Sequence, residues 1–250
     1  MRLGLIPSIC KNGDTKFNFD KIKQHMKSGS QKNLDFVFFG ESFLQGFDSL
    51  TWNFLNDKNI AVSKNDSIIL EIKQHAIKEK IGVGFGYFEL VDDSIYSSYI
   101  IIDKEGKESL NYRRISKGWK KIKKADFHYK EGNEVVFFTD SGIKYLVGLC
   151  GDFWAKSSLK KFRKNIKAED CIIWPVHVDY SIDEWNKEMR YYNKKASKLS
   201  NTVLMINNQM SPSTHGGAFI YQKNSTKRID FDVEEMIIFE RTPLNNVLIL

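Results

Sequence analysis

The feature that most constrains the fold of this chain is a series of short, uniformly apolar segments bounded by polar residues. They lie at 3–7, 35–40, 80–88, 97–103, 134–138, 144–150, 171–176 and 202–208. Several lack the alternating polar positions of a strand with one wet face, so we expect strands buried on both faces. Segments typical of helices lie between them, at 19–29, 66–80, 157–165 and 181–200. This alternation, with a strand-rich centre and a hairpin turn at 103–106, predicts a layered α/β protein.

The length of 250 residues is compatible with a single domain over 1–250, because α/β folds often reach this size. No apolar stretch approaches the roughly 20 residues that a membrane-spanning helix needs. The opening MRLGLIPSIC is too short in its apolar part for a signal peptide, and KNGD interrupts it. The three cysteines are an odd number without close pairing, which is typical of a reducing compartment. We therefore expect a cytoplasmic protein without membrane contact.

The net charge of +7 raises nucleic acid as a possible partner, because clustered Lys and Arg bind phosphates. The basic residues gather in two runs, KGWKKIKK at 117–124 and KSSLKKFRKN at 156–165. Neither run is interleaved with aromatic residues as a stacking surface would be, and no zinc-finger or RNP motif is present. We interpret both runs as solvated faces, and expect no nucleic-acid partner.

The segment KYLVGLCGDFWAKSSL at 144–159 carries the strongest chemical signal. An apolar strand ends at Cys150, Gly151 follows at once, and a helix is expected next. This order is typical of a nucleophile elbow, in which the glycine permits a sharp turn and the helix start directs N–H dipoles at the side chain. Those dipoles would favour the thiolate and could stabilise an oxyanion. The alternative is that Cys150 fills the core, as free cysteines often do.

Two further segments supply groups that a nucleophilic cysteine needs. In NLDFVFFGESFLQGF, a strand delivers Glu41 to its C-terminal end, the edge where sites gather in α/β sheets. Apolar neighbours would desolvate that carboxylate and raise its pKa toward a value useful for proton transfer. The segment NYRRISKGWKKIKKADFHYKEGN at 111–133 follows another strand and carries several cations that could steady a thiolate and an oxyanion. Alone, Glu41 could equally be a surface residue that opens a loop.

Taken in order, GESFLQGF, YRR and VGLCGDFW resemble the three signature segments of the nitrilase superfamily of carbon–nitrogen hydrolases. Further matches lie at LGLIPSI, at 81–107, and at IIWPVHV, TVLMINNQ and HGGAFIY, so the resemblance spans nearly the whole chain. It implies a four-layer α-β-β-α sandwich and a catalytic set of Glu, Lys and Cys. It also implies hydrolysis of a non-peptide C–N bond through a thioester, without metal or organic cofactor, in a protein that forms dimers. Glu41 and Cys150 match two of the three catalytic positions.

The third position departs from the pattern, which is Tyr-Arg-Lys in the family and Tyr112-Arg113-Arg114 here. Arginine is bulkier than lysine and is not an equivalent point charge. Lys117 or Lys120 could fold back into the role, and Trp119 could anchor the segment, which favours Lys120. The supporting glutamate of this loop is also missing, and Asp126 can take its place.

Several other residues could line the site. Trp154, four residues after the cysteine, and His177, after an apolar strand, are candidate pocket walls, although both could equally be packed core residues. His215 is a further candidate of the same kind. No metal-ligand spacing joins the histidines, so we expect no metal. Cys10 and Cys171 are interpreted as core or loop residues.

These observations predict a hydrolase of a small amide, carbamoyl compound or nitrile. In this hypothesis Glu41 takes the thiol proton, Cys150 attacks, and a cation from 114–120 steadies the oxyanion. Two alternatives remain. The first is a catalytically impaired protein that keeps the fold and binds a ligand, and the second is a basic protein that binds nucleic acid. The substrate itself cannot be read from the fold.

Overall fold

The protein is described from a computed structural model, which covers residues 1–140, 142–223 and 225–241. Two six-stranded sheets form its centre. In the first sheet the order is β14-β1-β2-β3-β4-β5, with bounds Ile237–Glu240, Arg2–Leu5, Phe36–Phe38, Gly82–Val91, Ser94–Ile102 and Glu108–Arg113. In the second the order is β13-β12-β9-β8-β7-β6, with bounds Ser225–Ile229, Ala218–Gln222, Thr202–Asn207, Cys171–Val176, Ile143–Val147 and Phe137–Asp140.

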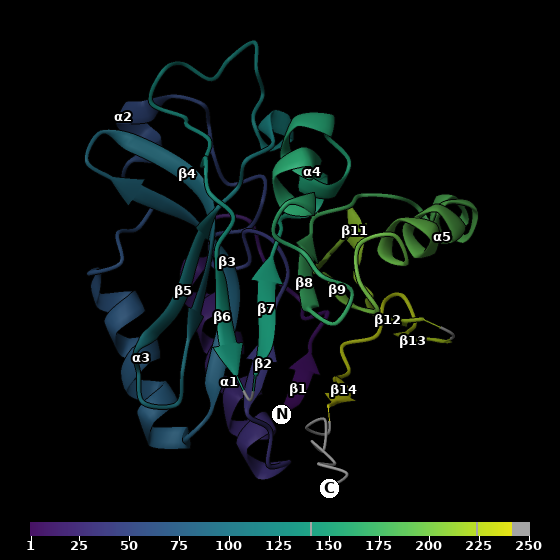
Figure 1. The fold of residues 1–250 in the computed structure, drawn as a ribbon. Helices are drawn as coiled ribbons and strands as arrows, with labels where there is room; N and C mark the ends of the chain where they lie inside the picture. The colour runs from purple at the N-terminus through teal and green to yellow at the C-terminus, as the bar shows by residue number, and fades with distance from the viewer. Residues whose placement is uncertain (141, 224, 242–250) are drawn as a thin grey trace, which may run out of the picture.

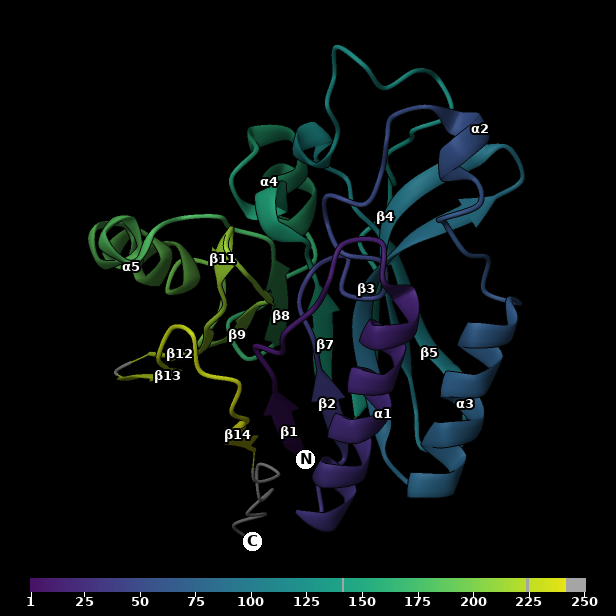
Figure 2. The same cartoon turned by 180° about the vertical axis from the view of Figure 1, so that it is seen from behind.

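The helices cover the outer faces of the two sheets. Their bounds are α1 Thr15–Gln31, α2 Phe54–Asp57, α3 Ser67–Glu79, α4 Lys156–Arg163 and α5 Ile182–Ala196. Figures 1 and 2 show α1 and α3 on the side of the first sheet and α4 and α5 on the side of the second. A further pair of short strands is formed by β10 (Gln209–Met210) and β11 (Thr214–His215). The four-layer α-β-β-α arrangement predicted from the sequence is confirmed.

Both sheets are parallel at their centres and antiparallel toward their edges. Strands β1, β2 and β3 run parallel, as do β7, β8 and β9, whereas β3, β4 and β5 form an antiparallel meander. The parallel strands are the uniformly apolar ones, as expected for strands covered on both faces. The predicted turn at 103–106 does connect β4 to β5, with Gly106 at φ 76°.

Apolar side chains hold the layers together in two main clusters. Between the sheets, residues such as Leu5, Phe38 and Tyr99 of the first sheet pack with residues such as Val147 and Ile173 of the second. A second cluster joins α1 and α3 to the outer face of the first sheet through Phe19, Ile22, Met26, Ile69, Ile72 and Ala76. Burial of such side chains contributes roughly 1.5–3 kcal/mol each, which makes the sheets a firm support for residues at their edges.

The structure adds to or shifts the predicted elements at three places. The strand expected at 134–138 is β6, Phe137–Asp140, because Val135 and Val136 pack against the core without joining the ladder. The helix expected at 157–165 is α4, Lys156–Arg163, and a 3₁₀ turn, Cys150–Phe153, separates it from the strand. The strands β13 and β14 were not predicted. Among the described residues, no helix is both long and apolar enough to cross a bilayer.

Candidate active site

The candidate site lies where strands of both sheets end. Glu41 follows β2, Cys150 follows β7 and His177 follows β8. The backbone N–H of Glu41 donates to the carbonyl of Val176 at 3.4 Å, so the two sheets meet here. Carboxyl ends of parallel strands are where α/β proteins place their sites, because the loops that follow converge there.

Cys150 sits on a strained turn. Its φ is 36°, in the left-handed region that L-residues rarely adopt. The indole Nε1 of Trp174 donates to the Cys150 carbonyl at 3.0 Å, and the thiol donates to the carbonyl of His177 at 3.5 Å. The glycine expected to relieve the turn, Gly151, is outside the left-handed region. The strain is therefore carried by the cysteine itself, as in a nucleophile elbow.

Glu41 is fully buried, with its two oxygens in different settings. Oε1 accepts hydrogen bonds from Arg114 Nη1 at 2.7 Å and from Ser97 Oγ at 3.1 Å. Oε2 has no hydrogen-bond partner among the described residues. Burial raises the pKa of Glu41, against the lowering effect of the Arg114 charge. The site thus holds a carboxylate with one oxygen anchored and the other available to a proton.

Arg114 lies between Glu41 and the elbow. Its guanidinium is buried, and its Nε donates to Ser116 Oγ at 2.9 Å. A Cβ atom added to Gly151 would lie only 2.6 Å from Arg114 Nη2, so the guanidinium packs directly against the residue after Cys150. Gly151 makes room for the arginine rather than for the turn.

The thiol of Cys150 ionises less readily than the sequence analysis predicted, because its pKa is raised rather than lowered. Burial raises its pKa to about 11, while the Arg114 charge lowers it and the Glu41 charge raises it. At neutral pH the group is therefore mostly the neutral thiol, because the thiolate fraction falls tenfold per unit below the pKa. A base that removes the proton during attack is then needed.

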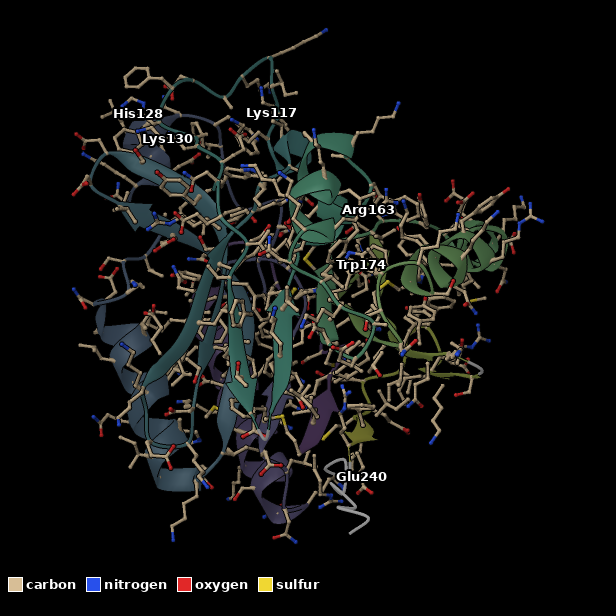
Figure 3. All side chains as sticks on the ribbon, in the orientation of Figure 1. Lys117, His128, Lys130, Arg163, Trp174 and Glu240 are labelled. Atoms are coloured by element: carbon tan, nitrogen blue, oxygen red, sulfur yellow. The ribbon has the colours of Figure 1, made fainter. Side chains whose placement is uncertain are left out.

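The other cations proposed from the sequence are placed elsewhere. Lys120 pairs with Glu131 at 2.5 Å and donates to the carbonyl of Tyr129 at 2.8 Å. Lys117 is exposed, and Figure 3 shows it near the top of the molecule, well above Trp174, whose indole contacts Cys150. The structure brings Arg114, and neither lysine, into contact with Glu41.

The acid suggested as a supporting group, Asp126, also lies outside the site. Its carboxylate accepts from the backbone and ring nitrogens of His128, at 3.0 and 2.9 Å. The acid of this loop that does reach a lysine is Glu131, through Lys120. Glu131 precedes Gly132 in the sequence KEGN, a signal that could have found it.

A buried acid that the sequence argument passed over connects the two signature segments. Oδ1 of Asp152 accepts from the backbone N–H of Ile115 at 3.2 Å and of Ser116 at 2.7 Å. Oδ2 accepts from the Tyr112 hydroxyl at 2.6 Å and from Leu149 N at 2.9 Å. Asp152 therefore ties the segment that carries Arg114 to the turn that carries Cys150.

Two asparagines at the end of β9 hold the backbone around the site. Asn208 accepts from Gly40 N and donates to the carbonyl of Glu41, both at 2.8 Å. Asn207 accepts from Val178 N and donates to Val178 O, both at 3.0 Å. The sequence signal for this role was the pair of asparagines that ends the apolar run TVLMINN, because buried side-chain amides need hydrogen-bond partners.

A pocket of about 580 Å³ opens onto Cys150. Its lining includes Trp154 and His177, the two candidate walls, together with Val178, Asp179, Tyr180, Glu188, Tyr191 and Tyr192. His177 stacks on Phe47 with ring centroids 4.1 Å apart, and burial lowers its pKa to about 4. Its ring is thus a neutral wall at neutral pH. His215 instead contacts Asp232 and does not line this pocket.

Over the part of the chain that the structure describes, no three His, Cys, Asp or Glu side chains gather as a metal site would require. The candidate site brings a thiol, a carboxylate and a guanidinium together in one cluster. Such a set is suited to attack on an electrophilic carbon.

Solved structures with a similar fold include a glutamine-dependent NAD+ synthetase from Acinetobacter baumannii (TM-score 0.77, 16% identity), covering 96% of this chain and 45% of that one. This chain thus spans less than half of the synthetase. They also include an amidase from Nesterenkonia sp. (TM-score 0.72, 13% identity), covering 95% of this chain and 88% of that one. A mutant of the Nesterenkonia sp. AN1 amidase, with acrylamide added at its active-site cysteine, has TM-score 0.72 and 12% identity, covering 95% and 91%. Among proteins of curated function, none matches this sequence.

The sequence also matches the model of a protein family. The match covers residues 4–166, which include Glu41, Arg114 and Cys150, and the family is described as carbon-nitrogen hydrolase. This agrees with the resemblance of the three signature segments, and with the four-layer fold. The chain belongs to the carbon–nitrogen hydrolase family, within the nitrilase superfamily.

Proposed function

We propose that this protein hydrolyses a C–N bond of a small amide, carbamoyl compound or nitrile through a thioester on Cys150. The observation that carries the proposal is the asymmetry of Glu41. One of its oxygens is held by Arg114 and Ser97, and the other is buried without a partner beside the strained cysteine turn. A buried acceptor without a hydrogen-bond partner destabilises the folded state, so its presence calls for an explanation. In this proposal the explanation is that the free oxygen of Glu41 receives a proton.

For an amide, the reaction follows from these groups. Glu41 takes the proton of the Cys150 thiol as the sulfur attacks the carbonyl carbon. The resulting tetrahedral intermediate collapses, and the proton on Glu41 passes to the nitrogen that leaves as ammonia or an amine. Water then attacks the thioester while Glu41 takes a proton from it, and the carboxylic acid leaves with the thiol restored. Arg114, permanently charged, holds Glu41 in place and stabilises negative charge on sulfur and oxygen.

The amidase similarity supports an amide as the first substrate to test. That amidase carries an active-site cysteine that reacts with acrylamide. In our proposal Cys150 has the same role, and the aromatic pocket above it accommodates the acyl group. In this proposal Arg114 is the catalytic cation, a role for which the sequence analysis favoured Lys120.

The test is release of ammonia from a panel of small amides and nitriles by the parent protein, Cys150→Ala, and a Cys10→Ala control. We expect turnover by the parent and the control only. Intact-protein mass spectrometry of the parent, quenched with acid during turnover of the best substrate, should show an acyl adduct that Cys150→Ala lacks. Equal ammonia release by the parent and Cys150→Ala would reject Cys150 as the nucleophile. No release from any compound that the parent binds would replace the hydrolase by the ligand-binding alternative.

A further inference from the structure

A second hollow, of about 670 Å³, adjoins the pocket above Cys150. It is lined by five cations and two apolar side chains, Lys156, Lys160, Arg163, Lys164, Lys195, Trp154 and Leu159. No acidic residue lines it. Trp154 lines both this hollow, which we call the basic groove, and the pocket that contains the thiol.

The cations of the basic groove are not neutralised. None of the five side chains has an ion-pair or side-chain hydrogen-bond partner among residues 1–140, 142–223 and 225–241. Four of the five are exposed and Lys195 is half-buried, whereas two less exposed lysines elsewhere are paired, Lys21 with Glu234 at 2.8 Å and Lys120 with Glu131 at 2.5 Å. Lys161, next to the groove, donates to the carbonyl of Asn133 at 2.8 Å. The basic groove therefore concentrates unshared positive charge.

Helix ends explain only part of this concentration. Lys160 and Arg163 lie in the last turn of α4 and Lys195 in the last turn of α5, where cations favour the helix dipole. Lys156 lies in the first turn of α4, where the same dipole disfavours a cation. A ligand with negative charge accounts for its presence where the dipole does not.

The positive charges that line the basic groove also repel one another. Lys195 is less exposed than the others, and its ammonium lies 4.6 Å from the centre of the Trp154 ring. Burial lowers the pKa of Lys195, and the charges of Arg163 and Lys198 lower it further. A bound anion would relieve this repulsion, because opposite charge favours the ionised form.

We propose that the basic groove binds an anionic group, of phosphate type, on the part of the substrate that does not react. Trp154 lies between that group and the thiol, so a ligand seated in the groove extends its amide over Trp154 to Cys150. Figure 3 shows Arg163 on α4 above Trp174, the residue that contacts the Cys150 carbonyl. The identification of the substrate class rests on the proposed hydrolase function, whereas anion binding itself does not.

The first experiment measures binding without turnover. Calorimetry with inorganic tripolyphosphate at low ionic strength should show binding by the parent and by Cys150→Ala. Lys160→Gln/Arg163→Gln should weaken it about tenfold or more, the scale of one lost charge-assisted hydrogen bond. Lys121→Gln/Lys123→Gln removes the same charge from exposed lysines outside the groove and should leave the affinity unchanged. Equal weakening by both double variants, or no binding by the parent, overturns the proposal.

The second experiment identifies the source of the anion. Turnover of alkanamides that end in a phosphonate is compared with that of unsubstituted alkanamides of equal length. We expect the phosphonate to lower KM about tenfold in the parent and to have no effect in Lys160→Gln/Arg163→Gln. Equal KM values for both series reject the proposed substrate class. If neither series is hydrolysed, while the parent still binds tripolyphosphate through the groove, the hydrolase proposal is the one that fails. Tighter, groove-dependent binding of a single-stranded oligonucleotide than of tripolyphosphate would assign the groove to nucleic acid and overturn the small-molecule ligand.

Discussion

At the scale of single residues, the position held by Arg114 decides how the site can work. Lysine at this position would present one point charge, whereas arginine presents several N–H donors in a fixed plane. The structure uses two of them, toward Glu41 and Ser116. Arginine also stays charged at every pH of interest, and the neighbouring anions raise its pKa further despite its burial. The cation of this site is thus a fixed charge and not a proton carrier.

The first prediction separates the three candidate cations. Arg114→Ala should abolish turnover, at a cost of about 3 kcal/mol or more in transition-state stabilisation. It removes both the charge and the partner that holds Glu41. Lys117→Ala should stay within roughly 0.5 kcal/mol of the parent, as surface substitutions usually do. Lys120→Ala should also leave kcat/KM nearly unchanged, because Lys120 is paired with Glu131 rather than with Glu41. The values of kcat/KM on the best amide measure this, and a loss confined to Lys120→Ala would restore the lysine assignment.

The second prediction concerns the fit between Arg114 and Gly151. Gly151→Ala should lower kcat roughly a hundredfold, because the added Cβ displaces the guanidinium and small displacements in a site cost that much. In an Arg114→Lys background the same change should cost much less, since lysine lacks the planar head that collides with it. Steady-state kinetics of the four proteins complete the cycle. Additive losses would show that the two positions do not interact.

The third prediction is a pH dependence. Burial raises the pKa of Cys150 to about 11, so its thiolate fraction, and its alkylation rate, should rise about tenfold per pH unit from neutrality toward that value. Cys150 should still be labelled first, because Cys10 and Cys171 are almost completely buried and burial also raises their pKa values. Mass spectrometry after brief iodoacetamide treatment checks both points. An alkylation rate that stays constant from about pH 7 to about pH 9 would mean that the thiol is already ionised at neutral pH.

At the scale of elements, the loop after β5 and the turn after β7 are held together by one carboxylate. Asp152 accepts four hydrogen bonds, and these come from Tyr112, Leu149, Ile115 and Ser116. Strand β5 belongs to the first sheet and β7 to the second, so this carboxylate fixes one layer against the other. The relative positions of Arg114 and Cys150 depend on it.

The fourth prediction follows from that role. Asp152→Asn should lower the free energy of unfolding by roughly 3 kcal/mol, because an amide N–H₂ would face N–H or O–H groups that then lack an acceptor. Denaturant titration measures this, with the exposed Asp183→Asn as the matched control, expected to change little. An Asp152→Asn protein as stable as the control would show that the loop is held by other contacts.

At the scale of the whole molecule, the surface is divided by charge. Two acidic residues, Asp179 and Glu188, line the pocket above Cys150. The charged residues that line the basic groove are all cations. The net charge of the chain is +7, and its positive charge is distributed unequally between these two neighbouring hollows. The basic run at 156–165, interpreted from the sequence as a solvated face, contributes most of the groove.

The fifth prediction is the assembly. We expect a homodimer, because nitrilase-like proteins usually associate and closed two-fold pairs are the commonest assembly. Ile182, the first residue of α5, is a large apolar side chain that stays exposed in the single chain. Light scattering at micromolar concentration should give twice the monomer mass. A monomer mass, unchanged on concentration, would remove the expectation.

Local patterns in the sequence predicted a layered α/β protein and two candidate site residues. Apolar runs without a wet face favour strands covered on both faces, and the four-layer sandwich was implied by the resemblance of the three signature segments. Glu41 and Cys150 could be named because each directly follows such a strand, and a strand end fixes where its next side chain lies. The same reasoning predicted the hairpin turn at 103–106 and placed α1, α3 and α5 within a few residues.

Only the tertiary structure shows which of the candidate cations contacts Glu41. Arg114, Lys117 and Lys120 are close in sequence, and no periodicity in a loop says which side chain turns inward. That choice depends on contacts from distant segments, since Asp152 binds the loop, Gly151 leaves room for a guanidinium, and Glu131 draws Lys120 away. The basic groove also depends in part on the fold, because Lys195 of α5 joins the basic run at 156–165 there. A sequence pattern reports only on neighbours, and therefore could not show this pairing.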